Sequence, residues 1–461
     1  MFVLLLKAVP PNRRIQALIC FLAGLFVVSL FLVDLDSEEG HAPGSNASLG
    51  APEVASGGRS TTAAVSESSP SPYNYGKGKI ATGYKYKIFV YEEDLPMDLY
   101  GALLRDVHCR NDYNGAEALL PSVLKSLDVY TPFGDLADYY VVPVMTECFL
   151  NKKLLAGRDF NWALKDLNAL FESTLDEIQS SYPHWSRTEG RDHIFVFPSE
   201  RGPQLLNEAN LQRIRKSIFV TGLTSYKPSV FEPWKDIVVP AWRKLDSNSS
   251  AAASAWDEDA ERDIFLHFRG MVPGIEDQQP SGLTYELQMA IEDADEDEIR
   301  GKIVFKDLDE ECGDLDCVRE EMRRSTFCLC PGGDYEGWSL RLYHAITAGC
   351  IPVIFADQAE LPFAELIDYS KFSVKILEKD AADFPRILGE MKEERVRSKR
   401  HSLKQIADRF SWQYLEDDPK AKGGPPQWKP SSALDSLLQV LHLKLRYMRN
   451  SPYNFWLKAD A

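Results

Sequence analysis

The chain has 461 residues, of which 44% are hydrophobic, so it can bury full cores in two to three domains. Its net charge is −17, and this acidic balance argues against a nucleic-acid-binding protein. The acidic run 293–298 is interpreted as a solvated face and not as a metal site.

The N-terminal segment predicts a membrane anchor. Residues 15–33 form an uncharged run of 19 residues, just long enough to span a bilayer. Basic residues lie before it in 1–14, and acidic residues follow it directly. The positive-inside rule therefore predicts a single-pass type II protein, with 1–14 in the cytosol and the rest in the lumen of the Golgi or endoplasmic reticulum. The alternative is a cleaved signal peptide, but no small-x-small site directly follows the run.

Residues 34–83 are rich in Ser, Gly, Ala, Pro and Thr, which predicts a disordered stem. The stem holds the glycosylation pattern Asn46-Ala47-Ser48, and a second pattern begins at Asn248. An oxidising lumen permits disulfides, and we expect Cys109 to pair with Cys148 and Cys312 with Cys317. No paired CxxC pattern indicates a zinc site.

Strands and helices alternate through 84–245, which predicts an α/β domain with a mostly parallel sheet. We expect helices over 113–127 and 162–178, and strands over 85–91, 138–144, 194–197, 217–221 and 236–239. The polar, acidic segment 246–262 is interpreted as a linker to a second domain.

The second predicted domain spans 263–410 and a helical tail spans 411–461. The strands of this domain are expected over 263–268, 303–305, 327–330, 350–355 and 372–376. Its helices are expected over 318–325 and 340–348, and Gly349 is expected to cap the second of them. Cys328 and Cys330 alternate along one strand, so they point to opposite faces and cannot easily bond each other. Apolar residues over 434–445 predict a final amphipathic helix that packs back across both domains.

The loop between the strand 327–330 and the helix 340–348 predicts an anion site. Glycines in it let the backbone approach a ligand closely, and the helix start offers free N–H groups. Ser339 and Arg341 lie in the first helical turn, where a cation indicates a strongly anionic ligand such as a diphosphate. The alternative is an ordinary strand–helix turn with an arginine paired to a carboxylate.

Several segments resemble exostosin-like glycosyltransferases, the glycosyltransferase family 47. They are 135–143 (DLADYYVVP), 182–193 (YPHWSRTEGRDH), 231–240 (FEPWKDIVVP), 327–331 (FCLCP), 349–354 (GCIPVI) and 361–363 (LPF). The resemblance covers about 84–408. It implies an inverting enzyme of the GT-B type, in which two Rossmann-like domains face each other across a cleft. The first domain would bind a glycan acceptor and the second a nucleotide sugar, namely a UDP-sugar, as co-substrate and with no further cofactor.

The resemblance also suggests site residues. The expected donor-binding residues are Arg269, Gly270, Gly332, Gly333, Glu336, Gly337, Ser339, Arg341 and His344. An inverting enzyme needs a base from the first domain, and Asp192 is the first candidate and Glu147 the second. Asp192 could instead cap a turn. No metal site is expected, because Asp314-Leu315-Asp316 is interpreted as a loop closed by a disulfide.

His344 departs from the family, which usually has Glu at this position. A catalytically silent lumenal scaffold, or a partner subunit of a glycosyltransferase complex, is therefore the alternative to an active enzyme. A glycosidase is a third and weaker interpretation, since no carboxylate pair stands out. Related enzymes often work in complexes, so homo- and hetero-oligomers both stay open.

Overall fold

The structure is a computed structural model that describes residues 79–91, 109, 114–222, 230–242, 256–257, 259–270, 282–294, 301–307, 312, 314–332, 340–412 and 431–450. All of them belong to one compact unit, Pro70–Ala461. The predicted membrane span, most of the predicted stem and both glycosylation patterns lie outside the described residues. Within these ranges, no helix is both long and apolar enough to cross a membrane.

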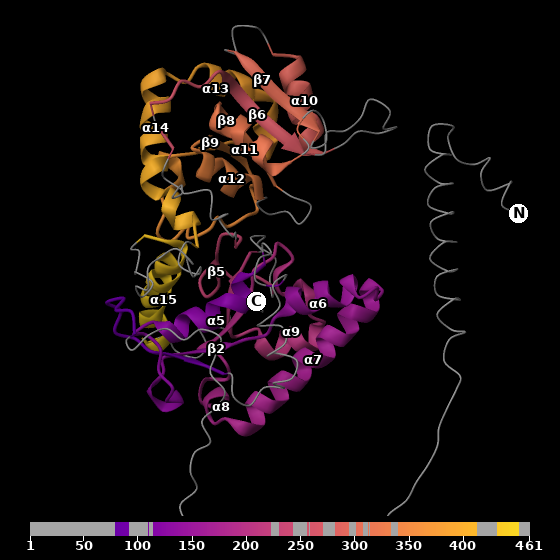
Figure 1. Ribbon diagram of the computed structural model, residues 1–461, viewed down its shortest axis with the longest axis vertical. Coiled ribbons are helices and arrows are strands. Elements are labelled where there is room, and N and C mark those ends of the chain that lie inside the picture. The colour runs from indigo at the N-terminus through magenta and orange to yellow at the C-terminus, as the bar shows by residue number, and fades with distance from the viewer. Residues whose placement is uncertain are drawn as a thin grey trace, which may run out of the picture. The chain divides into compact units, whose positions relative to one another are not determined.

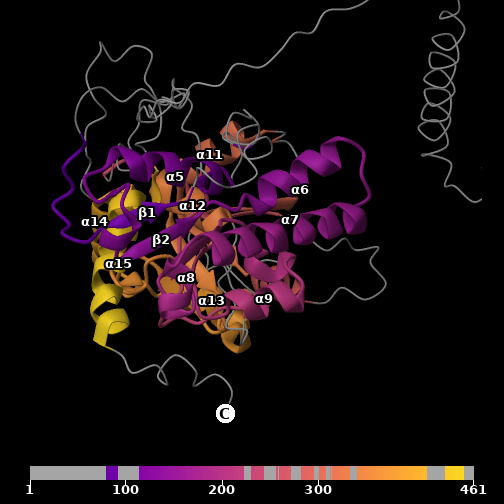
Figure 2. The same ribbon diagram turned by 90° about the horizontal axis from the view of Figure 1, so that it is seen from below.

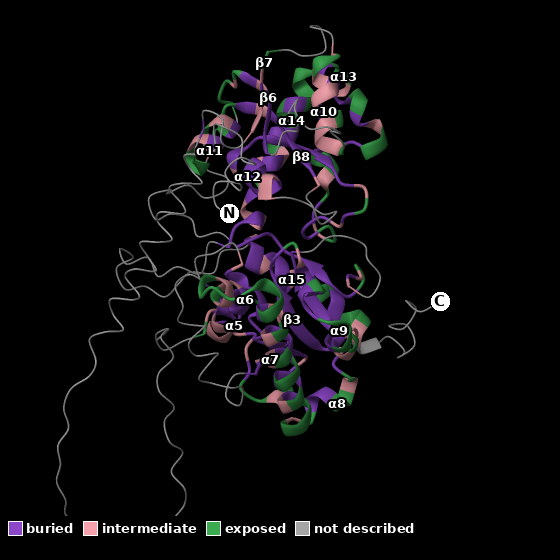
Figure 3. Ribbon diagram, turned by 90° about the vertical axis from the view of Figure 1, so that its right-hand side faces the viewer, coloured by how far each residue is buried: buried purple, intermediate pink, exposed green. Residues whose placement is uncertain are grey.

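Five parallel strands form the sheet of the first half, in the order β1–β2–β3–β4–β5 (Figure 1). They are β1 Ile88–Val90, β2 Tyr139–Val142, β3 His193–Phe197, β4 Ile218–Thr221 and β5 Ile237–Val238. Every residue of β2 to β5 is buried, as the strand colouring in Figure 3 shows. Burial on both faces explains the near-continuous apolar runs, and the predicted parallel sheet is confirmed.

Helices cover both faces of this sheet. They are α5 Ala116–Ser126, α6 Thr146–Leu155, α7 Phe160–Ser181, α8 His184–Thr188 and α9 Glu208–Ile214, with 3-10 turns η3 Gly134–Leu136 and η4 Gly202–Leu205. Side chains alternate along the strands, so Val141 packs in one core with α5, and Tyr140 packs in another with α6 and α7. The predicted α5 and α7 are confirmed, whereas α6, α8 and α9 were not predicted.

The second half contains a five-stranded parallel sheet in the order β10–β9–β8–β6–β7. Its strands are β6 Ile264–Gly270, β7 Lys302–Asp307, β8 Ser325–Pro331, β9 Ile351–Phe355 and β10 Val374–Lys375. All five predicted strands are confirmed with small shifts at their ends. The chain is therefore a mixed α/β protein with two parallel sheets.

The helices of this half are α10 Leu283–Glu292, α11 Leu315–Arg323, α12 Leu340–Ala348, α13 Phe384–Gly389 and α14 Glu393–Ile406, with 3-10 turns η5 Tyr369–Lys371, η6 Glu378–Asp383 and η7 Ala407–Phe410. The helix predicted over 318–325 ends at Arg323, because Ser325 already belongs to β8. Gly349 ends α12 as predicted, at a φ of 73° that a side chain would strain.

The final helix, α15 Ala433–Asn450, contacts both halves, as predicted. The Tyr86 and Tyr139 hydroxyls donate to the carbonyls of Leu438 and Leu441, at 2.8 and 2.7 Å. In the second half, Glu365 Oε1 lies 3.0 Å from Lys444 Nζ. This helix therefore connects the two sheets through buried contacts.

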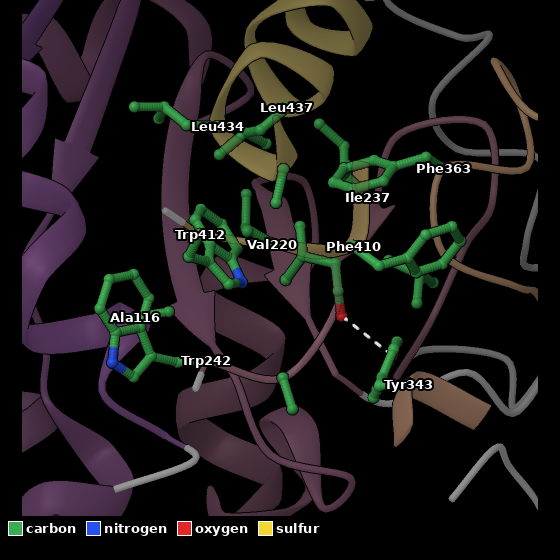
Figure 4. Close-up of a cluster of buried hydrophobic side chains, with 14 of the residues drawn as sticks. Ala116, Val220, Ile237, Trp242, Tyr343, Phe363, Phe410, Trp412, Leu434 and Leu437 are labelled. Atoms are coloured by element: carbon green, nitrogen blue, oxygen red, sulfur yellow. Dashed lines mark hydrogen bonds between the residues drawn. The ribbon is translucent and has the colours of Figure 1, made fainter. Parts of the chain in front are cut away.

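Direct contacts between the halves gather after the carboxyl end of β5. The Phe363 amide donates to the Val238 carbonyl at 3.1 Å, and the Tyr343 hydroxyl to the Val239 carbonyl at 3.4 Å. Figure 4 shows Tyr343 with its hydrogen bond, Phe363, and the tryptophans Trp242 and Trp412, all of which belong to one apolar cluster. The second half thus contacts the first half at the carboxyl edge of the first sheet.

The structure contains three disulfides among the described residues. Cys109–Cys148 and Cys312–Cys317 confirm the two predicted pairs. The third, between Cys328 and Cys350, was not predicted and joins β8 to the start of β9. The described Cys330 is unbonded and buried, in agreement with the expectation that it points away from Cys328.

Candidate active site

The second sheet has a topological switch point between β6 and β8. The chain goes from β6 outward to β7, then returns to β8 on the other side of β6. In open parallel sheets, ligands bind beyond the carboxyl ends of the strands at such a point. Here those ends are Arg269-Gly270 of β6 and Pro331-Gly332 at the end of β8, from which the chain continues to α12.

Arg341 belongs to the first turn of α12, and its side chain extends over this point. Its Nε donates to the carbonyl oxygen of Arg269 at 2.8 Å, and its guanidinium lies 4.8 Å from the centre of the Phe268 ring. A Cβ at Gly270 would lie 3.1 Å from Arg341 Cζ, so the glycine makes room for the guanidinium. The predicted donor residues Gly270 and Arg341 are therefore brought together, with Arg341 half-buried.

Arg269 is placed differently from its predicted role. Its side chain is only 1% exposed and makes two bonds to Glu321 of α11, from Nε at 2.6 Å and from Nη2 at 2.9 Å. Hydrogen bonding from Arg269 lowers the pKa of Glu321 below its ordinary value. Because this carboxylate already holds the guanidinium, the geometry favours Arg269 as a residue that positions β6, and not as a direct phosphate contact.

Glu321 has a second partner in β6. His267 Nε2 lies 3.1 Å from Glu321 Oε2, and the imidazole is buried. Burial lowers the pKa of His267 to about 4, although Glu321 opposes this shift, so the ring is neutral at pH 7. The His267–Glu321–Arg269 group therefore fixes α11 against β6. Sequence reasoning missed Glu321, because no local pattern links it to residues more than fifty positions away.

The other predicted donor residues divide into two sets. Gly332 lies directly after β8, and its N–H donates to the carbonyl of Phe355 at 2.9 Å. His344 lies one turn after Arg341 on α12 and is largely buried. Gly333, Glu336, Gly337 and Ser339 lie outside the described residues.

Asp192, the first candidate base, immediately precedes β3 and therefore lies at the amino end of the first sheet. It accepts hydrogen bonds from Thr188 Oγ1 at 2.6 Å and Arg187 Nη2 at 3.1 Å, and its Oδ1 lies 2.8 Å from His193 Nδ1. Burial alone would raise the pKa of Asp192, but these partners outweigh it and lower that pKa. These side-chain contacts hold Asp192 in the turn before β3. This turn lies at the edge away from the direct contacts with the second half.

Glu147, the second candidate base, lies at the opposite edge. It belongs to the first turn of α6, which follows the carboxyl end of β2. Its buried carboxylate accepts a hydrogen bond from Ser199 Oγ and has Arg201 Nη1 at 3.6 Å. Ser199 and Arg201 follow the carboxyl end of β3, so these three side chains converge on the edge that faces the second half.

A neighbouring carboxylate stabilises this arrangement. Glu117 of α5 accepts from the Cys148 amide at 2.5 Å and the Glu147 amide at 3.3 Å. These amides lie at the start of α6, where N–H groups have no partner within the helix. Glu117 accepts from them and so acts as a remote cap. Burial raises the pKa of Glu117 above its ordinary value. Sequence reasoning missed this role of Glu117, since the amides that it caps lie thirty residues away.

Asp314 and Asp316 both have partners within the protein. Asp314 caps α11 by accepting from the Cys317 amide at 2.8 Å, and Asp316 pairs with Arg319 at 2.8 Å. Among the described residues, one group of cysteine and acidic side chains has ligand atoms within 4.8 Å of one another: Cys312, Cys317 and Glu321. Its two sulfurs are bonded to each other and its carboxylate holds Arg269, so the group offers no ready metal ligands.

Residues 83–391 match the Exostosin GT47 domain. A probable glucuronosyltransferase of Oryza sativa subsp. japonica is 28% identical over 332 residues, which cover 69% of this chain and 73% of that protein. A probable glucuronoxylan glucuronosyltransferase of Arabidopsis thaliana is 30% identical over 312 residues, covering 66% of this chain and 63% of that protein. A probable beta-1,4-xylosyltransferase of the same plant is 30% identical over 330 residues, covering 69% of this chain and 74% of that protein.

The matched region contains both parallel sheets and the group around Arg341, Arg269 and Gly270. Its length exceeds half of the chain, and relatives named as glycosyltransferases match 66–69% of the chain. The chain belongs to the exostosin GT47 family and is a glycosyltransferase.

Proposed function

We propose that the chain is an inverting glycosyltransferase that binds a nucleotide sugar at the carboxyl ends of β6 and β8. The observation that carries this proposal is the position of Arg341, whose guanidinium lies over the end of β6 at the switch point. A diphosphate bound there would meet this cation and the positive end of α12.

The two parallel sheets support a GT-B arrangement, with an acceptor-side domain over 84–245, a linker over 246–262 and a donor-side domain over 263–410. In this proposal the acceptor binds at the carboxyl edge of the first sheet. Glu147 lies at that edge and Asp192 does not, so we propose Glu147 as the base that removes the acceptor hydroxyl proton. The positive charge for the leaving diphosphate comes from Arg341 and α12, with the nucleotide sugar as co-substrate and without a bound metal ion.

The names of the relatives suggest the transferred sugar. Two are named as glucuronosyltransferases and one as a β-1,4-xylosyltransferase. We therefore propose UDP-glucuronate or UDP-xylose as donor and a xylan-type polysaccharide as acceptor. The three disulfides suit the oxidising lumen of the secretory pathway, where the predicted anchor over 15–33 would hold the protein in the Golgi membrane.

A transfer assay tests this proposal. The purified full-length chain is incubated with labelled UDP-glucuronate or UDP-xylose and with xylo-oligosaccharides, and products are analysed by mass spectrometry and by NMR of the new linkage. We expect one donor to give an acceptor product of inverted anomeric configuration. No transfer, no donor hydrolysis and no nucleotide binding would favour the silent scaffold, to which the substitution of His344 for the usual Glu points.

A further inference from the structure

The hairpin tip between α6 and α7, residues 152–165, exposes apolar side chains. Leu155 is 77% exposed, Trp162 is 61% exposed and Phe160 is 42% exposed. All residues from 155 to 162 are exposed, in a half whose strands are almost entirely buried. These three side chains belong to neither core of the first half and make none of the contacts described above. The packing of the fold therefore does not account for their exposure.

The tip is held firmly by the residues around it. Gly157, at a φ of 78°, follows the end of α6, and its N–H donates to the Leu154 carbonyl at 2.9 Å. Asp159 caps α7 by accepting from the Asn161 amide at 2.9 Å. An ion pair of 2.9 Å between Lys153 and Asp166 joins the two helices, which lie side by side in Figures 1 and 2. The backbone that carries the exposed rings is therefore held in place by these contacts.

The tip also carries positive charge in an acidic protein. Residues 152–165 contain the four cations Lys152, Lys153, Arg158 and Lys165 and the one acid Asp159, a balance of +3, while the chain has −17. Lys165 Nζ lies 5.3 Å from the centre of a Trp162 ring, so cation and aromatic surface adjoin each other. An anionic ligand with apolar faces is complementary to this combination.

The tip lies on the acceptor side of the molecule. The α6 helix starts directly after the carboxyl end of β2, and α7 then runs from the tip to α8 at the amino end of β3. We propose that the tip is a binding surface for an acidic polysaccharide, in which sugar rings pack on Trp162 and Phe160 and uronate carboxylates pair with Lys152, Arg158 and Lys165. This inference rests on the proposed function, since it makes the tip a second contact for the acceptor chain.

A membrane surface fits the tip less well. Insertion of the three apolar side chains would bring the exposed Asp159 carboxylate, which caps α7, toward the hydrocarbon region. In a polysaccharide complex the same carboxylate stays in water. The charge balance and the exposed rings therefore favour a soluble acidic chain over a lipid surface.

Binding to immobilised glucuronoxylan, measured with the full-length chain and without nucleotide, tests the proposal. We expect retention that weakens about tenfold in Trp162→Ala and at least as much in the triple variant Lys152→Ala, Arg158→Ala, Lys165→Ala. The wild type should bind carboxyl-reduced glucuronoxylan no better than these variants bind glucuronoxylan. The matched controls are Phe133→Ala, an exposed ring elsewhere on the first half, and the triple variant Lys375→Ala, Arg395→Ala, Arg397→Ala on the second half.

Equal binding by the wild type and both tip variants would overturn the proposal, as would equal binding to the carboxyl-reduced polymer. Loss of binding to anionic vesicles in the same variants, without a change on glucuronoxylan, would assign the tip to lipid instead. A nucleotide titration of each variant separates this result from a failure of the proposed function. The tip variants should bind UDP like the wild type, whereas a wild type that binds no nucleotide would contradict the donor site and not the tip.

Discussion

Arg341 Nε donates to the main-chain carbonyl of Arg269 at 2.8 Å, and this bond joins the first turn of α12 to the end of β6. The two residues are 72 positions apart, yet together they define the switch point of the second sheet. The side chain of Arg269 turns the other way, to Glu321. One arginine therefore fixes the strand, while the other lies at the diphosphate site that we propose.

Gly270→Ala should weaken nucleotide binding without unfolding the protein. An added methyl group would lie 2.7 Å from Phe268 Cζ and 3.1 Å from Arg341 Cζ, so the guanidinium would have to shift. We expect UDP affinity to fall about tenfold, the loss of roughly one hydrogen bond to a charged group. Calorimetric titration measures it, and the melting temperature without nucleotide is the control. An unchanged affinity would mean that Arg341 does not contact the ligand.

The free energy of unfolding should fall on acidification through His267. This imidazole takes up a proton near its ordinary pKa of 6.5 when unfolded, but only near pH 4 when folded. Between these values the unfolded state binds more protons, so the stability that is present above pH 6.5 is lost as pH falls towards 4. The loss is about 3 kcal/mol for this group. Denaturant unfolding at several pH values measures it, and His267→Gln should flatten the dependence.

Asp192→Asn and Glu147→Gln should separate structure from catalysis. Asp192 is tied to Arg187, Thr188 and His193, so its substitution should lower stability by about 1–3 kcal/mol and leave the transfer rate of the folded enzyme within about twofold. Glu147→Gln should lower that rate by about 10²- to 10⁴-fold. The reverse pattern would restore Asp192 as the base.

Lys444→Met should destabilise the connection between the two halves. The buried ammonium group lies 3.0 Å from Glu365 and donates to the carbonyl of Pro233 at 3.0 Å. We expect a loss of about 2 kcal/mol in thermal or denaturant unfolding, because these partners would lose a charged donor. Lys371→Met is the matched control, since Lys371 is 70% exposed and its pair with Asp368 contributes less than about 1 kcal/mol. Equal effects of the two variants would exclude a bridging role for Lys444.

The sequence predicted the strands well because buried parallel strands are apolar on both faces. The residues of β8 and β9 are examples, and the cap at Gly349 also followed from local pattern. The short helices α8 and α9, and α6 with its weak apolar periodicity, gave no such signal. Their positions depend on distant partners, such as the Glu117 carboxylate at the start of α6.

Site roles were harder to predict, because a motif does not say at which edge of a sheet it lies. Asp192 stands in a family motif, but the structure places it at the amino end of β3. Arg269 was expected among the donor-binding residues, and only the fold reveals that Glu321 holds it. The disulfide between Cys328 and Cys350 likewise depends on the pairing of β8 with β9, which local sequence does not specify.

The most direct test of the donor site is a calorimetric titration of UDP into the full-length wild type and Arg341→Ala. We predict binding by the wild type and a loss of about 10- to 100-fold in the variant, the effect of removing a charged hydrogen-bond donor. Arg323→Ala, on the exposed face of α11, should bind like the wild type. Equal UDP affinity in the wild type and Arg341→Ala, or no binding by either, would contradict a nucleotide-sugar site at the ends of β6 and β8.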